Sequence, residues 1–133
     1  MSEYQQKKMK SYLLPEAVYR QALWAVKDLP RMREKLMELE QSIDRLPQIY
    51  TGQPRCSGIH ADLTAARAGQ MASLAMRIRI IEDSLKIVPE KYQDGILDKV
   101  AYGVPYPDLH HSNTWKRWQQ VFLYQVAVGL QLY

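Results

Sequence analysis

The chain has 133 residues, of which 47% are hydrophobic and 24% are charged. This length fits one domain with a modest core, and the composition is typical of a folded globular protein, which argues against a largely disordered chain and against a membrane protein. The net charge of +4 is compatible with a polyanionic partner, but many proteins with other functions are equally basic.

Residues 1–14 form a polar lead-in that carries Lys7, Lys8 and Lys10 close together. Nothing in its pattern buries a face, so we expect a loose tail. The segment is too polar for a secretory signal, and no run approaches the roughly 18 apolar residues of a spanning helix. We therefore expect a cytoplasmic protein with no membrane partner.

Residues 15–88 are expected to form an N-terminal helical region. Pro15 suits the first turn of a helix, whose apolar stripe comprises Val18, Ala22, Leu23 and Val26. Pro30 predicts a break near residues 28–29 and a fresh start, because proline disfavours helix for the residue before it. The second helix is predicted to run to about Leu46, with a stripe of Met32, Leu36, Leu39 and Ile43.

Residues 47–60 contain two prolines and two glycines without a helical or strand period, which predicts a loop. A long third helix is expected from Ala61 or Asp62 to about Ile87, with a length of roughly 40 Å. Its apolar stripe comprises Leu63, Ala66, Met71, Leu74, Ile78, Ile81 and Leu85. We expect Pro89 to end this helix and to open the next one.

Residues 89–133 read as helix, tight connection, helix. The first of these helices should stop at Gly103. Pro105 and Pro107 leave room for no more than a single turn or a short helix before His111, and Ser112 or Asn113 can cap the last helix. The sequence therefore predicts an all-α fold, in which N-terminal helices and one long helix lead into a C-terminal helix-turn-helix.

A helical wheel of the last helix separates two faces. Trp115, Trp118, Phe122, Val126 and Gly129 fall on the side expected to be buried. The opposite arc contains no acid and comprises Asn113, Lys116, Arg117, Gln120, Tyr124 and Ala127. Amide, guanidinium and ammonium groups of this kind read bases or bind phosphates, and a recognition helix presents them near its N-terminus. The same arc is also compatible with an ordinary solvated helix face.

The terminal stretch TWKRWQQVFLY and the preceding stretch IEDSLKIVPEKY resemble the phage transcriptional regulators of the RinA and ArpU type. The likeness covers most of residues 15–130. It implies a domain similar to the fourth region of bacterial sigma factors, with the last helix on promoter DNA. The groove-facing residues implied in this way are Asn113, Thr114, Lys116, Arg117 and Gln120. Many such proteins have a regular helix where this chain has the short, proline-rich VPYPDLHHS.

The remaining titratable side chains do not predict a metal or catalytic site. His110 and His111 diverge by about 100° on a helix and cannot readily bind one metal, and Glu82 and Asp83 diverge likewise as an acid and base pair. No phosphate-cradling glycine motif and no nucleophile elbow is visible. We therefore expect no enzyme, no cofactor and no metal.

The leading hypothesis is a sequence-specific, phage or prophage DNA-binding transcriptional regulator whose residues 89–133 bind double-stranded DNA. Its N-terminal helices would serve oligomerisation or contact RNA polymerase, and we expect a homodimer. Tyr124 is the aromatic residue most worth testing for DNA contact. The alternatives are a helical scaffold or adaptor of phage assembly and a small DNA-packaging subunit that forms a ring.

Overall fold

The structure is a computed structural model that describes residues 5–44 and 54–133. The described residues form five α-helices and one short 3-10 helix, with no strand, so the predicted all-α class is confirmed. The elements are η1 (Lys10–Tyr12), α1 (Glu16–Lys27), α2 (Leu29–Asp44), α3 (Pro54–Leu85), α4 (Glu90–Tyr102) and α5 (Ser112–Gly129).

The chain divides into two compact units. One unit comprises the chain up to Pro30 together with Arg79–Tyr133, and the other comprises Arg31–Ile78. The lead-in, α1, α4 and α5 therefore belong to the same unit, although the lead-in and α5 lie at opposite ends of the sequence.

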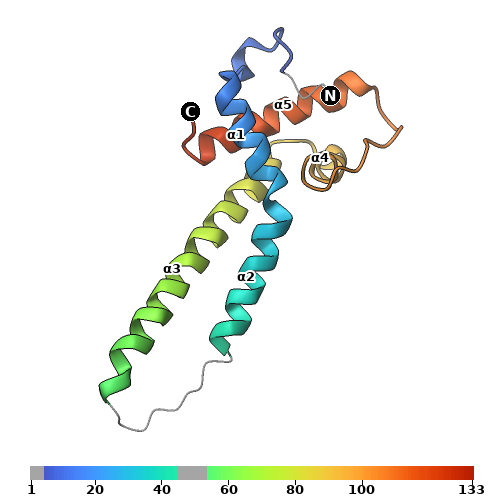
Figure 1. The fold of residues 1–133 in the computed structure, drawn as a ribbon. Helices are drawn as coiled ribbons and strands as arrows, with labels where there is room; N and C mark the ends of the chain where they lie inside the picture. Colours follow the sequence, from blue (N-terminus) through green and yellow to red (C-terminus); the bar gives the residue numbers. More distant parts are fainter. Residues whose placement is uncertain (1–4, 45–53) are drawn as a thin grey trace. The chain divides into compact units, whose positions relative to one another are not determined.

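In the first unit α1 packs against both α4 and α5, and α4 also packs against α5, as Figure 1 shows. Each helix contributes its apolar stripe to one core. The fully buried side chains include Val26 of α1, Ile96 of α4, and Phe122 and Leu123 of α5. Burial of such side chains stabilises the fold by roughly 1.5–3 kcal/mol each before the entropic cost of folding is counted.

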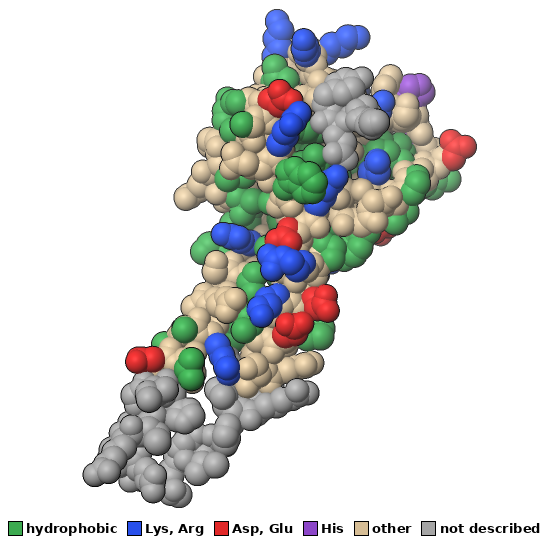
Figure 2. Space-filling view, in the orientation of Figure 1, with side chains coloured by type: hydrophobic (Ala, Val, Ile, Leu, Met, Phe, Trp, Pro, Cys, Tyr) green, Lys and Arg blue, Asp and Glu red, His purple; other side chains and the backbone are tan. Residues whose placement is uncertain are grey.

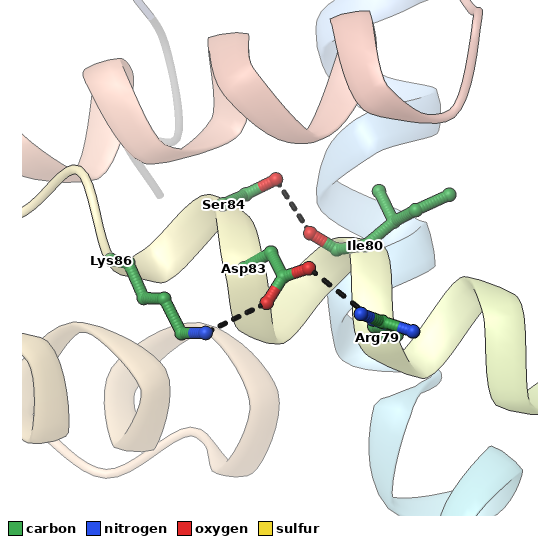
Figure 3. Close-up of polar contacts among 5 residues, drawn as sticks. All are labelled: Arg79, Ile80, Asp83, Ser84 and Lys86. Carbon is green, nitrogen blue, oxygen red and sulfur yellow. Dashed lines mark hydrogen bonds and ion pairs between the residues drawn. The ribbon is translucent and has the colours of Figure 1, made fainter.

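The end of α3 closes the same core. Ile81 is fully buried, and the Ser84 hydroxyl donates to the Ile80 carbonyl at 2.7 Å (Figure 3). A Cβ added to Gly129 would lie 2.6 Å from Ile80 Cγ2. The missing side chain at Gly129 therefore allows the last turn of α5 to approach α3.

Asp83 lies on the solvent side of this turn. Its carboxylate accepts from Lys86 at 3.0 Å and lies 3.7 Å from the Arg79 guanidinium (Figure 3). All three side chains are at least half exposed, so these pairs contribute little to stability.

In the second unit α2 and α3 run in opposite directions (Figure 1). Met32, Leu39, Leu74 and Ile78 are its buried apolar side chains among those described. On the predicted stripe of α3, Leu63 is 49% exposed, Ala66 is exposed and Met71 is half-buried. The predicted stripe of α3 is thus buried only toward the C-terminal end of the helix.

The positions of the prolines predict most helix boundaries correctly. Helix α1 begins directly after Pro15 and ends at Lys27, and α2 begins at Leu29 with Pro30 in its first turn. Helix α4 follows Pro89 and ends at Gly103, whose φ of 70° lies in the left-handed region that glycine adopts most readily.

The start of α3 differs from the prediction. Residues 54–60 are helical, so the predicted loop 47–60 is wrong over this part, and residues 47–53 lie outside the described residues. Proline is favourable at the first position of a helix, where its missing N–H costs nothing, and an internal glycine weakens a helix by only about 1 kcal/mol. The helix has 32 residues and spans about 48 Å.

The connection between α4 and α5 lies where the sequence predicts it. It occupies residues 103–111 and contains a turn but no helix, as expected from the room for a single turn or a short helix before His111, although it is longer than a tight connection. A helix-turn-helix typically joins its two helices by a turn of roughly three or four residues. The two prolines of this segment prevent α4 from continuing and α5 from starting earlier.

Candidate nucleic-acid interface

The N-terminus of α5 is capped by an unexpected residue. The cap is His111, whose Nδ1 accepts from the Asn113 backbone N–H at 3.1 Å, and not Ser112 or Asn113 as the sequence suggested. The Asn113 side chain stays exposed as a result. The first turn of a helix leaves further N–H groups unpaired and carries a partial positive charge, which favours anions at this end of α5.

Trp115 fixes the orientation of this first turn. Its ring is 2% exposed, is stacked on Tyr106 at 4.9 Å, and meets the edges of Tyr92 and His110. The indole N–H finds no hydrogen-bond partner among the described residues. A buried Trp115 turns the adjacent Lys116 and Arg117 outward, and both are exposed.

The six predicted DNA-binding residues separate into three groups. Asn113, Lys116 and Arg117 are exposed, Thr114 and Tyr124 are half-buried, and Gln120 is 3% exposed. The expected exposure of Gln120 is wrong, and so is that of Ala127, which is fully buried. The expected burial of Gly129 is also wrong, because Gly129 is exposed, and Trp118 is only half-buried.

Gln120 is buried because the lead-in covers it. Its Oε1 accepts from the Gln6 backbone N–H at 2.7 Å, and its Nε2 lies 3.3 Å from the carbonyl oxygens of Gln6 and Tyr12. The side-chain amide thus pairs with the main chain as another peptide group would. These contacts leave Gln120 no free face with which to read a base.

The described part of the lead-in is therefore not a loose tail. The Gln5 side chain bonds both the backbone N–H and the carbonyl of Leu14, at 2.6 and 2.7 Å, and Leu14 is buried. The Tyr12 ring meets the Tyr124 ring edge-on at 5.4 Å. Residues 5–14 form a closed loop that is docked on α5.

Docking of the lead-in creates an open groove of about 840 Å³ in the first unit. Gln5, Gln6, Lys7, Lys8 and Met9 line one side, and Asn113, Lys116 and Arg117 line the other. Four of these eight residues are basic and none is acidic. Lys and Arg side chains gather over the lead-in in Figure 2.

The described residues do not neutralise the four cations of this groove. Within residues 5–44 and 54–133, no ion pair engages Lys7, Lys8, Lys116 or Arg117. Like charges gathered on one concave surface raise the local concentration of anions. An extended polyanion can bind along such a groove.

Tyr124 lies outside the groove lining. Its ring is engaged with Tyr12 and with Tyr133, the latter at 6.1 Å. These contacts help to hold the lead-in on α5. A direct contact of Tyr124 with DNA remains a prediction.

The histidines have local roles. His111 caps α5, and the half-buried His110 packs on Tyr92 at 4.7 Å. No group of three His, Cys, Asp or Glu side chains that could hold a metal is found among the described residues, and the side chains of Cys56 and His60 lie outside them.

The sequence alone does not identify Lys7 and Lys8 as site residues, nor the reason why Gln120 is polar. The lysine cluster is evident in the sequence, but a polar segment without an apolar stripe predicts a loose tail. Gln120 and Gln6 are 114 positions apart, a separation that helical periodicity cannot detect.

Comparison of the chain with protein-family models, with curated proteins and with solved structures gives no significant match. The resemblance to phage regulators therefore stays a hypothesis, and any function has to be inferred from the residues of the groove. Among the described residues, no helix combines the length and the apolar character that crossing a bilayer requires.

Proposed function

We propose that this protein binds double-stranded DNA through the groove between the lead-in and the first turns of α5. The observation that carries the proposal is the lining of this groove, whose described residues bring Lys7, Lys8, Lys116 and Arg117 together and include no acid. Phosphate contacts of Lys and Arg supply most of the affinity of proteins for DNA, and backbone N–H groups at a helix N-terminus add to it.

The role proposed for this binding is transcriptional regulation of the phage type suggested by the sequence resemblance. Asn113 is the exposed side chain that can bond a base edge, and Arg117 can bond guanine or a phosphate. Gln120 has no part in base reading in this proposal, because its amide is engaged with the lead-in. Contact with RNA polymerase belongs to the same proposal.

The test is a selection of bound sequences from random duplexes, followed by affinity measurements on the selected duplex. Replacing Lys116 and Arg117 together with Ala should weaken binding at least tenfold and flatten the dependence of log K on log salt by about two units, at unchanged helicity. Failure to enrich any duplex, or unchanged affinity of this variant, would refute the proposal.

A second function, a helical scaffold or adaptor, is favoured by one feature of the second unit. Leu63 and Met76 of α3 and Met37 of α2 are 49%, 60% and 59% exposed, more apolar surface than a solvated hairpin needs. Retained affinity for a protein partner, together with no binding to any duplex, is the outcome that favours this second function.

A further inference from the structure

We infer that residues 5–14 are an arm that grips the phosphate backbone of the bound duplex, and that Gln120 is the positioning residue that holds this arm beside α5. The inference rests on the proposed function, because it assigns a separate task to one wall of the same groove. It adds two phosphate-binding residues, Lys7 and Lys8, and one residue that acts only through them.

The arm presents its lysines on a tight turn. The Met9 backbone N–H donates to the Gln6 carbonyl at 3.1 Å, which closes a four-residue turn with Lys7 and Lys8 at its two central positions. Both side chains are exposed. A turn of this kind projects its central side chains away from the chain that carries it, here into the groove lining.

Gln120 grips the base of this turn. Its amide bonds both the N–H and the carbonyl of Gln6, the first residue of the turn. A third contact, to the Tyr12 carbonyl, ties down the far end of the arm. Because these groups are part-buried, each would lose a partner if the Gln120 amide were removed.

Charge by itself would drive the arm away from α5. Lys7 and Lys8 face Lys116 and Arg117 across the groove, and like charges at such an approach repel. The arm is held instead by the neutral amides of Gln120 and Gln5 and by the buried Leu14. A bound polyanion would offset this repulsion. The docked position of the arm should therefore be most stable when a phosphate backbone occupies the groove.

The chemistry of the two walls differs. The arm offers ammonium groups, which bind phosphates as point charges, whereas Asn113 and Arg117 on α5 offer planar groups that can bond base edges. The arm should therefore contribute affinity and salt dependence for every duplex, and α5 should carry any preference for sequence.

The experiment measures affinity for a labelled random-sequence duplex of about two helical turns over a range of salt concentrations, with the full chain. Replacing Lys7 and Lys8 with Gln should weaken binding about tenfold and flatten the slope of log K against log salt by about two units. The matched control replaces Arg67 and Arg77 of α3 with Gln, which removes the same charge from the other unit, and should leave this slope unchanged.

Gln120→Met tests the positioning role, since methionine keeps the length and shape of glutamine but not its amide. It should flatten the slope by one to two units although all four cations remain. In the Gln120→Met protein, replacing Lys7 and Lys8 should change the slope by less than about half as much as in the unaltered protein, because the effects of groups that act together are not additive. If Gln120→Met does not fold, Gln5→Ala, which frees Leu14 at the other end of the arm, is measured in its place.

One outcome separates this inference from the proposed function, a second refutes both, and a third bears on Gln120 alone. If replacement of Lys116 and Arg117 flattens the slope but replacement of Lys7 and Lys8 behaves like the α3 control, the arm is refuted and DNA binding through α5 stands. If the unaltered protein binds no duplex, both are refuted. Full, additive effects of the lysines in the Gln120→Met protein refute the positioning role of Gln120.

Discussion

Position 95 shows how a single missing side chain can set the geometry of a site. A Cβ on Gly95 would lie 2.6 Å from Cη2 and 2.7 Å from Cζ3 of Trp115, closer than carbon atoms can approach. The ring cannot retreat, because Tyr106 is stacked on its other side and Tyr92 meets its edge. Helix α4 therefore accepts the indole against its backbone, and Trp115 in turn aims the basic pair of α5.

We predict that Gly95→Ala destabilises the protein by about 1–3 kcal/mol, the usual cost of overpacking a buried site. The free energy of unfolding in urea measures this loss, and tryptophan fluorescence reports the shift of the Trp115 ring. Gly69→Ala is the control, because an added Cβ there meets nothing within 4 Å. It should stabilise α3 by up to about 1 kcal/mol. Equal effects of the two changes would show that the Gly95 contact does not constrain the fold.

Gln120 marks the limit of what the sequence could predict for a single residue. Helical spacing correctly gave the burial of Trp115, Phe122 and Val126, because their apolar character and their period agree. The same helical spacing placed the polar Gln120 on the arc expected to be exposed. Its burial depends on a segment at the other end of the chain. A polar residue satisfied by distant main-chain groups has no periodic signal.

At the scale of elements, most ends of helices were predictable from the sequence, and the start of α3 was not. Pro15, Pro30, Pro89 and Gly103 act through local backbone geometry, so the sequence indicates them directly. Pro54 was misread because a proline marks a helix start as readily as a loop. The α4–α5 connection spans the residues that the sequence leaves between Gly103 and Ser112, but the stacking of Tyr106 on Trp115 within it has no signal in the sequence.

The cap of α5 gives an element-scale prediction. His111→Ala removes the acceptor for the Asn113 N–H and should cost about 0.5–1 kcal/mol in the free energy of unfolding, with fraying of the turn that carries Lys116. His111→Asn should restore most of the loss, because asparagine is among the best capping residues. Circular dichroism during urea unfolding measures both.

Ser112→Ala is the matched control for this prediction. Ser112 is exposed and was one of the two caps expected from the sequence, but the described cap bond belongs to its neighbour His111. The control should change stability by less than about 0.5 kcal/mol, as surface substitutions usually do. A larger loss of stability from Ser112→Ala than from His111→Ala would show that Ser112, and not His111, caps α5.

For the molecule as a whole, the total charge is a poorer indicator of an anion site than the positions of the charged side chains. Residues 89–133 carry as many acidic as basic residues, so a sum over this region gives no indication of an anion site. The groove becomes basic because the fold adds Lys7 and Lys8 from the start of the chain to Lys116 and Arg117 near its end. Only the tertiary structure brings the two pairs together.

The two units should also differ in local stability. The first unit contains the fully buried side chains of α1, α4 and α5, whereas residues 62–66 of α3 are all exposed. Amides with little burial around them open by local fluctuation, with free energies well below that of global unfolding. We predict that backbone amides of residues 62–70 exchange with deuterium at least about tenfold faster than those of residues 119–127.

The dependence of this exchange on protein concentration tests the adaptor function. If a second chain covers Leu63 and Met76, protection of residues 62–70 should rise with concentration, because association adds its free energy to that of local opening. Met76→Glu would then abolish the rise, since a carboxylate at an apolar contact is costly to bury. Fast exchange at every concentration would show that no second chain covers the exposed apolar surface of α3. If residues 62–70 of a dilute monomer are as protected as α5, the predicted difference in stability between the units is contradicted.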